Sequence, residues 1–278
     1  MEFLAPAKVN LSLRVLRRRD DGFHEIESLM CPVSIFDTLE IAHREEGGLE
    51  FVCDDSTLPT GEDNLVVRAA KLFCGACGLE PRMWIALTKR IPHGAGLGGG
   101  SSDAATTLIG LNQVFGTDLS REALSAMAAD LGSDVPFFIY QSAAMIRGRG
   151  EQVEPIEFPH ALPLFLIKPP FGVPTPWAYQ RWRESREIPG VPYAPQEFAW
   201  GSLVNDLERP VFEKYIFLAD VKSWLLKQPE VGGALMSGSG STVFALLREK
   251  ESAAALGSRV AAEFGTNLWC CLCETVSG

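Results

Sequence analysis

Residues 92–102 have the composition of a phosphate-binding loop. The segment reads Pro-His-Gly-Ala-Gly-Leu-Gly-Gly-Gly-Ser-Ser, with five glycines and two serines. Glycine allows positive φ angles and lets a ligand approach the main chain closely. A helical pattern follows at Asp103, and the free N–H groups at a helix N-terminus favour an anion. The sequence therefore predicts a loop and a helix that together hold the phosphates of a nucleotide.

Two better-known phosphate motifs do not fit this loop. Gly94, Gly96 and Gly99 have the dinucleotide-binding spacing, but that fold needs a second strand with an acidic residue roughly 20 positions later. Residues 116–122 read instead as a turn and a helix cap. The P-loop needs Lys-Ser or Lys-Thr after its glycines, where this chain has Gly100-Ser101. A tight turn that only packs a helix onto a strand is the remaining alternative, and it would not need so many glycines.

Asp134 is the candidate general base for a phosphoryl transfer. Such a reaction needs an oriented hydroxyl nucleophile, and an acidic group often accepts its proton. Asp134 follows a predicted helix end and precedes Pro136 and an apolar segment, 137–140, that we predict to be a strand. A positioned base contributes about 10²- to 10⁴-fold in rate. An aspartate that only forms an Asx-type turn before the strand is an alternative that the sequence leaves open.

Lys8 and Asn10 share one face of the first predicted strand, because side chains alternate along a strand. A lysine that points inward is costly unless it is paired. Lys8 could pair with Asp134 or with phosphate, or it could be an exposed strand lysine. A second glycine-rich turn, 237–241, offers further N–H groups, although a plain hairpin is an alternative there. His93 lies inside the phosphate loop, where it either touches phosphate or faces solvent.

Composition narrows the classes of function. The 278 residues are 46% hydrophobic and 22% charged, as in ordinary globular proteins. The formal net charge of −10 disfavours a nucleic-acid partner. Seven cysteines without a signal-like start predict reduced thiols and a cytoplasmic location. We expect a small-molecule substrate, no membrane span and no obligate protein partner. The single Cys74-x-x-Cys77 pattern is a weak zinc signal.

Strands and helices alternate irregularly, which predicts an α+β fold. The predicted strands cover residues 3–16, 26–42, 49–53, 84–87, 137–140, 143–146, 164–167, 234–236, 243–245 and 268–272. The predicted helices follow caps at Asn64, at Ser102 or Asp103, at Ser120 and at Asn205-Asp206, with others at 221–227 and 252–264. Prolines around 155–163 predict a boundary between domains 1–157 and 158–278. Residues 168–200 read as an irregular connection.

Several segments together resemble the GHMP small-molecule kinases. Residues 6–11 (Pro-Ala-Lys-Val-Asn-Leu), 92–105 and 237–241 (Ser-Gly-Ser-Gly-Ser) resemble the three motifs of that family, in the same order. Within it, residues 22–26, 63–66, 132–138 and 205–208 resemble segments of the 4-diphosphocytidyl-2-C-methyl-D-erythritol kinase family. The matches extend over nearly the whole chain, so the resemblance is much more specific than the glycine loop alone.

The resemblance implies a fold, a reaction and cofactors. The fold is an N-terminal domain like the second domain of ribosomal protein S5 and an α/β-sandwich C-terminal domain, with the site between them. The reaction is ATP-dependent phosphorylation of the substrate's 2-hydroxyl group in non-mevalonate isoprenoid biosynthesis. Mg²⁺ is the implied metal, but no second carboxylate is clearly placed to bind it, so the metal ligands stay open.

The resemblance also assigns roles to single residues. Lys8 and Asp134 match the catalytic pair, and Asn64 falls near the adenosine. The residues that wrap the ATP phosphates are Pro92, His93, Gly94, Ala95, Gly96, Leu97, Gly98, Gly99, Gly100, Ser101 and Ser102. The residues that match substrate positions are Asn10, Phe23, His24 and Tyr179.

One substrate position departs from the family pattern. The family usually has Tyr where this chain has Phe23, a position that stacks on cytosine. Phenylalanine keeps the aromatic face and loses only the hydroxyl, so we expect stacking to persist with one hydrogen bond fewer. Tyr179 falls near the opposing aromatic, which predicts a cytosine held between Phe23 and Tyr179. Base stacking of this kind is worth ~1–3 kcal/mol per base.

Overall fold

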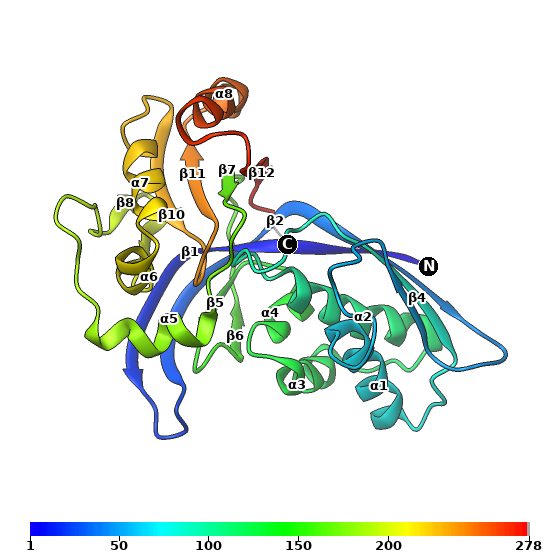
Figure 1. Ribbon diagram of the computed structural model, residues 1–278. Coiled ribbons are helices and arrows are strands. Elements are labelled where there is room, and N and C mark those ends of the chain that lie inside the picture. Colours follow the sequence, from blue (N-terminus) through cyan, green and yellow to red (C-terminus); the bar gives the residue numbers. More distant parts are fainter. Residues whose placement is uncertain (277–278) are drawn as a thin grey trace.

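The computed structural model describes residues 1–276, and within this range the strands form two sheets (Figure 1). The larger sheet has the order β3-β4-β2-β1-β9-β8, with β5 and β6 attached beside β2. Its strands are β1 (Glu2–Arg18), β2 (His24–His43), β3 (Glu50–Cys53), β4 (Met83–Thr88), β5 (Ala144–Arg147), β6 (Gln152–Pro155), β8 (Gln196–Phe198) and β9 (Gly201–Asn205). The smaller sheet has the order β10-β11-β7-β12. Its strands are β7 (Pro163–Lys168), β10 (Val231–Met236), β11 (Val243–Leu247) and β12 (Trp269–Glu274).

The helices gather around these sheets. They are α1 (Leu65–Cys77), α2 (Gly99–Phe115), α3 (Arg121–Leu131), α4 (Val135–Tyr140), α5 (Thr175–Arg181), α6 (Glu208–Lys214), α7 (Ile216–Leu225) and α8 (Ala253–Phe264). The long β1–β2 hairpin crosses the molecule, with α1 to α4 on one side and the smaller sheet toward its other end (Figure 1). This mixture of helices and largely antiparallel strands confirms the predicted α+β class.

The middle of β1 is buried on both of its faces, unlike an ordinary surface strand. Residues 5–11 are all buried. Ala7, Val9 and Leu11 belong to an apolar cluster that also holds Leu235 and Phe244 of the smaller sheet, so this cluster joins the two sheets. Because side chains alternate along the strand, Lys8 and Asn10 point to the opposite face. The strand thus carries the contact between the sheets on one face and the polar pair on the other.

Two predictions about the elements near the site were wrong. Residues 135–140 form helix α4 and not a strand. A short apolar run does not distinguish the two, and Pro136 suits the first turn of a helix. Helix α2 begins at Gly99, with Gly98 as its N-cap, and not after Ser102 or Asp103. The helix therefore starts inside the glycine loop, and Ser102 and Asp103 lie in its first turns.

Other expectations agree with the structure or need smaller corrections. Asn64 caps α1, since its side chain accepts the Val66 N–H, and Ser120 caps α3 in the same manner. Helix α1 continues through Gly75 and ends at Gly78, which has a positive φ of 64°. The stretch 168–200, predicted to be irregular, contains α5 and β8. Asn205 does not cap α6 directly, because that helix begins at Glu208 after Leu207.

The described part of the chain contains no helix long and apolar enough to cross a membrane.

The smaller sheet begins with β7 at Pro163, whereas β8 and β9 return to the larger sheet. The domain boundary after residue 157 stays a prediction.

Candidate active site

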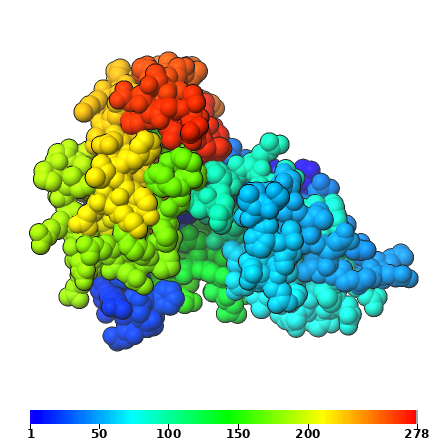
Figure 2. Space-filling view, in the orientation of Figure 1, coloured from blue at the N-terminus to red at the C-terminus, as the bar shows by residue number. Residues whose placement is uncertain are grey.

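A cavity of about 510 Å³ lies where the glycine loop, β1 and the 237–241 turn meet. This volume is within the usual range for small-molecule sites, roughly 300–1,000 Å³. The residues that line the cavity come from both halves of the chain, from Lys8 and Asn10 to Gly238 and Ser239. In the space-filling view, the light blue to cyan residues lie on the right and the yellow to red C-terminal residues lie at the upper left, above the dark blue N-terminal residues (Figure 2).

The glycine loop needs its glycines because backbone packs on backbone there. Gly94, Gly96 and Gly98 have positive φ angles of 63°, 75° and 73°. A methyl group at Gly96 would collide with the carbonyl oxygens of the 237–241 turn. At Gly98 it would come within 2.7 Å of the Phe138 ring and 3.0 Å of Lys8 Cγ. The loop is thus pressed against the neighbouring turn and the base of Lys8.

Hydrogen bonds hold the loop at successive points. The Lys8 N–H donates to Leu97 O at 2.9 Å, and the Thr242 N–H donates to Ala95 O at 3.1 Å. Ser237 Oγ donates to Gly96 O at 2.9 Å. The carbonyls of the loop are therefore bonded to protein, while the start of α2 lies at the cavity wall with free N–H groups of its first turn.

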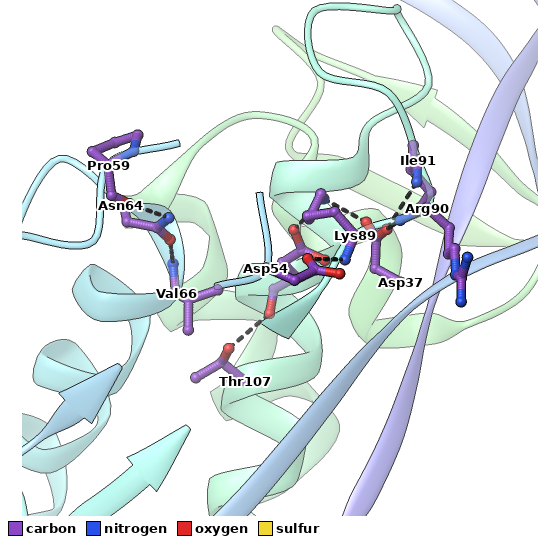
Figure 3. A network of polar contacts seen from close by, with 10 residues as sticks. Asp37, Asp54, Pro59, Asn64, Val66, Lys89, Arg90, Ile91 and Thr107 are labelled. Atoms are coloured by element: carbon purple, nitrogen blue, oxygen red, sulfur yellow. Dashed lines mark hydrogen bonds and ion pairs between the residues drawn. The ribbon is translucent and has the colours of Figure 1, made fainter. Parts of the chain in front are cut away.

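Most of the residues predicted to bind nucleotide line this cavity. They are Pro92, His93, Gly94, Ala95, Gly96, Gly98, Gly99, Gly100 and Ser101, together with Asn64. Leu97 and Ser102 are instead fully buried behind the wall. The Asn64 side chain is engaged at both ends, because Oδ1 accepts the Val66 N–H at 2.9 Å and Nδ2 donates to Pro59 O at 2.8 Å (Figure 3). Asn64 therefore shapes the wall through its cap.

Lys8, Asn10 and Asp134 lie together at the cavity wall, and the pairing of Lys8 with Asp134 was one of the alternatives that the sequence left open. Lys8 is 3% exposed, and its Nζ donates to Asn10 Oδ1 at 2.6 Å and lies 3.8 Å from Asp134 Oδ2. Burial lowers the pKa of Lys8, and the Asp134 carboxylate opposes that fall. The alternative of an exposed strand lysine was wrong. The Asp134 side chain is 38% exposed and caps no N–H group of α4, so its carboxylate is available at the cavity.

A buried ionic cluster under the glycine loop was missed by the sequence analysis. Lys89 Nζ donates to a carboxylate oxygen of Asp37 at 2.5 Å (Figure 3). It also donates to a carboxylate oxygen of Asp103 at 2.7 Å. The other Asp37 oxygen accepts the N–H groups of Arg90 and Ile91. Lys89 precedes the loop and Asp103 follows it, so their ion pair ties the two ends of the loop together. The only sequence signal was a lysine and an aspartate flanking the glycines.

Charge within this cluster is uneven, with two carboxylates and one ammonium. Burial raises the pKa of Asp103 to about 7, the Lys89 ammonium lowers it, and the Asp37 carboxylate adds to the rise. Asp103 Oδ1 has no hydrogen-bond partner among the described residues. The neutral form of Asp103 is therefore stabilised near neutral pH.

The residues predicted to bind the substrate divide into two groups. Asn10 and Tyr179 line the cavity. His24 is buried against Tyr179, with ring centroids 5.5 Å apart, and burial and Arg18 lower the pKa of His24. Phe23 is 48% exposed at the end of the β1–β2 hairpin. A cytosine between Phe23 and Tyr179 stays a prediction.

Arg149 is a second residue that the sequence analysis missed. It lines the cavity together with Ser133, Asp134 and Tyr179. Its guanidinium carbon lies 5.1 Å from the centre of the Phe23 ring, which is cation–π distance. In the sequence it lies between Gly148 and Gly150. A basic residue between two glycines next to a candidate site was the available signal.

Comparison with known proteins identifies the family. The profiles described as "GHMP kinases N terminal domain" and "GHMP kinases C terminal" match residues 64–142 and 197–266. A 4-diphosphocytidyl-2-C-methyl-D-erythritol kinase of Methylacidiphilum infernorum is 45% identical, with 89% of this chain and 86% of that protein covered. The chain belongs to this kinase family. It is therefore an enzyme of the kinase class, as the motifs predicted.

Solved structures agree with this assignment. A crystal structure of 4-(cytidine 5'-diphospho)-2C-methyl-D-erythritol kinase matches with a TM-score of 0.82 and 37% identity, over 99% of this chain and 100% of the other. A homoserine kinase from Cytophaga hutchinsonii matches with a TM-score of 0.70 and 22% identity, over 99% of this chain and 94% of the other. The second likeness concerns the fold alone. The kinase thus has the two-domain α+β fold that its motifs implied.

The Asp103 pKa makes the stability of the kinase depend on pH. The folded state holds the Asp103 proton more tightly than the unfolded chain, whose ordinary pKa is 3.8. The contribution of this group to stability is therefore full below about pH 4 and is lost as pH rises through about 7. We expect Asp103→Asn to remove this decline, measured by chemical denaturation at closely spaced pH values. An identical pH dependence in the variant and the wild type would contradict the raised pKa.

Proposed function

We propose that this kinase transfers the terminal phosphoryl group of ATP, with Mg²⁺, to the 2-hydroxyl of 4-diphosphocytidyl-2-C-methyl-D-erythritol. The product would be the 2-phosphate, an intermediate of non-mevalonate isoprenoid biosynthesis. The observation that carries the proposal is the Lys8–Asn10–Asp134 cluster, which lines the same cavity as the glycine loop. A phosphate donor on the loop and a hydroxyl acceptor in this cavity would meet at the carboxylate.

Asp134 would accept the proton of the substrate hydroxyl. Its half-exposed carboxylate borders the cavity, while Lys8 behind it is buried. The Lys8 ammonium lies 3.8 Å from the carboxylate and would reduce the negative charge that develops on the transferred group. Asn10 accepts from Lys8 and donates to Ser28 Oγ at 2.8 Å, so it fixes the direction in which Lys8 points.

The glycine loop would hold the phosphates through main-chain N–H groups. Its crowded backbone and the N-terminus of α2 suit an anion without a large positive field. This matters because the protein carries a net charge of −10. The described residues contain no cluster of three His, Cys, Asp or Glu side chains that could hold a metal ion. Mg²⁺ commonly binds through phosphates and one or two carboxylates, so a nucleotide-bound Mg²⁺ near Asp134 fits this site.

Arg149 would bind the diphosphate of the cytidine substrate. The diphosphate joins the cytidine to the methylerythritol group, so it would lie between the aromatic residues that hold the base and Asp134. Arg149 stands next to Phe23 and shares the cavity wall with Asp134. Its planar guanidinium can stack on the ring and donate to phosphate at the same time. We place this reaction in the cytoplasm, in keeping with seven free cysteine thiols.

Substrate choice is the direct test of the proposal. With ATP and Mg²⁺, the purified kinase should convert the cytidine diphosphate substrate to its 2-phosphate and release ADP. Mevalonate, homoserine and a sugar such as galactose serve as competing acceptors. Comparable or higher kcat/KM for one of these three would overturn the substrate assignment. ADP release measured by a coupled assay, with the product identified by phosphorus NMR, decides between them.

Asp134→Asn should abolish turnover and leave ATP affinity within a few-fold of the wild type. The amide has the shape of the carboxylate but cannot accept the proton, and the loss of a base costs about 10²- to 10⁴-fold in rate. Steady-state kinetics gives the rate, and calorimetry gives the affinity. A fully active variant would rule out the base role. If the protein only bound nucleotide and had no kinase activity, the wild type would show no turnover either.

Arg149→Met should raise KM for the cytidine substrate about tenfold or more, because a charge-assisted contact to phosphate is worth about 1.5–3 kcal/mol. KM for ATP should change little. Arg147→Met is the matched control, since Arg147 is similarly exposed and also has acidic partners, as Arg149 has in Glu151, but Arg147 does not line the cavity. Equal effects of the two variants on KM would contradict a diphosphate role for Arg149.

A further inference from the structure

Side chains form hydrogen bonds with the main-chain groups on the outer edge of β10. This strand ends the order of the smaller sheet, and no strand of the described residues pairs with its outer side. The Gln196 side chain accepts the Ala234 N–H at 3.0 Å and donates to Ala234 O at 2.8 Å. Two residues on, Glu208 accepts the Met236 N–H at 2.9 Å and Asn205 donates to Met236 O at 2.7 Å. Outward-facing groups of an edge strand recur at every second residue, so these side chains replace a neighbouring strand.

Asn205 differs from the other two because it also binds the glycine turn. Its Nδ2 donates a second hydrogen bond, at 2.7 Å, to Gly238 O inside the 237–241 turn. Its Oδ1 accepts the Leu207 N–H at 2.9 Å, which fixes the orientation of the amide. Asn205 is 4% exposed, so a carbonyl left without this donor would have little access to water. One buried amide therefore holds the strand end and the turn together.

Asn205 is itself fixed to the strand that carries Lys8 and Asn10. Strand β9 pairs in parallel with β1, with Leu13 opposite Asn205. The next residue, Asp206, donates its N–H to Leu13 O at 2.9 Å and accepts the Val15 N–H at 2.8 Å. The position of the turn is thus set relative to β1, although the turn belongs to the other sheet.

The 237–241 turn is in close contact with Lys8 and Asn10. A methyl group on Gly238 would come within 3.2 Å of Lys8 Nζ and 3.3 Å of Asn10 Oδ1. Gly238 and Ser239 line the cavity, and Ser239 Oγ lies 2.7 Å from Thr175 Oγ1 of α5. A displacement of the turn by a fraction of this distance would change the space above Lys8.

We propose that Asn205 is a positioning residue, which sets the 237–241 turn against Lys8 and Asn10 and so controls the rate of phosphoryl transfer. Asn205 itself does not line the cavity and acts through the turn. The effect on rate rests on the proposed function, whereas the placement of the turn does not. Misplacement of reacting groups by about 1 Å can cost about 10²-fold in rate.

The experiment compares Asn205→Ala and Asn205→Asp with Gln196→Ala. Gln196 is the matched control, because its side-chain amide, like that of Asn205, donates to a carbonyl of β10 but does not reach the turn. Asn205→Asp is the second variant should the alanine variant not fold: it keeps the size and the acceptor for Leu207 but places a carboxylate against two carbonyl oxygens. The readouts are kcat and KM for both substrates, denaturant unfolding, and hydrogen exchange of residues 236–242 with protein alone.

We expect both Asn205 variants to lower kcat about 10- to 100-fold and to speed exchange in the turn. The Gln196 variant should lose comparable stability and stay within a few-fold of the wild-type kcat, with a protected turn. The positioning role would be overturned if kcat fell in proportion to the loss of stability in all three variants. Unchanged hydrogen exchange in the Asn205 variants would overturn it as well. A wild type that does not phosphorylate the cytidine substrate contradicts the proposed function alone, and the exchange comparison still decides the placement of the turn.

Discussion

Backbone contact between two glycine-rich turns, above a buried lysine, is the constraint on which this site depends. Gly96 packs on the carbonyls of the 237–241 turn, and Gly98 packs on Lys8. The two turns come from different sheets, and the apolar cluster around Val9 and Phe244 keeps these sheets together. Side chains at the glycines would separate the turns and open the space over Lys8. The glycines are therefore required by packing as much as by any ligand.

Electrostatics at the site is arranged locally, against the net charge of −10. The lysine and arginine side chains that line the cavity each have an acidic neighbour: Lys8 lies near Asp134, Lys89 binds Asp37 and Asp103, and Arg149 lies 3.9 Å from Glu151. Because a buried charge is costly without a partner, these pairs make burial possible. They also leave little free positive charge, so an anion at this site must be held mainly by main-chain N–H groups. A glycine-rich loop, which exposes such groups, therefore suits a protein with a negative net charge.

The sequence was sufficient for features that are local or carried by a motif. The glycine loop, the Lys8–Asn10 face and the Asn64 cap could all be predicted, because periodicity and cap chemistry act over a few residues. The helix at 135–140 could not, since a six-residue apolar run has no decisive period. The Lys89 cluster, Arg149 and Asn205 depend on residues far apart in the chain, such as Asp37 and Asp103 or Leu13 and Met236. Only the fold brings them together.

Selection of the acceptor must come from a different part of the site than selection of the donor. In the proposed site, the glycine loop would bind through its main chain, so it could recognise a phosphate without contacting the rest of the ligand. A homoserine kinase shares the overall fold at 22% identity, which shows that the fold tolerates extensive change in side chains. Discrimination between acceptors therefore falls to side chains. We propose that Arg149 and Tyr179, which line the cavity, and Phe23, which lies against Arg149, make this selection, because two aromatic rings and one cation suit a nucleoside followed by a diphosphate.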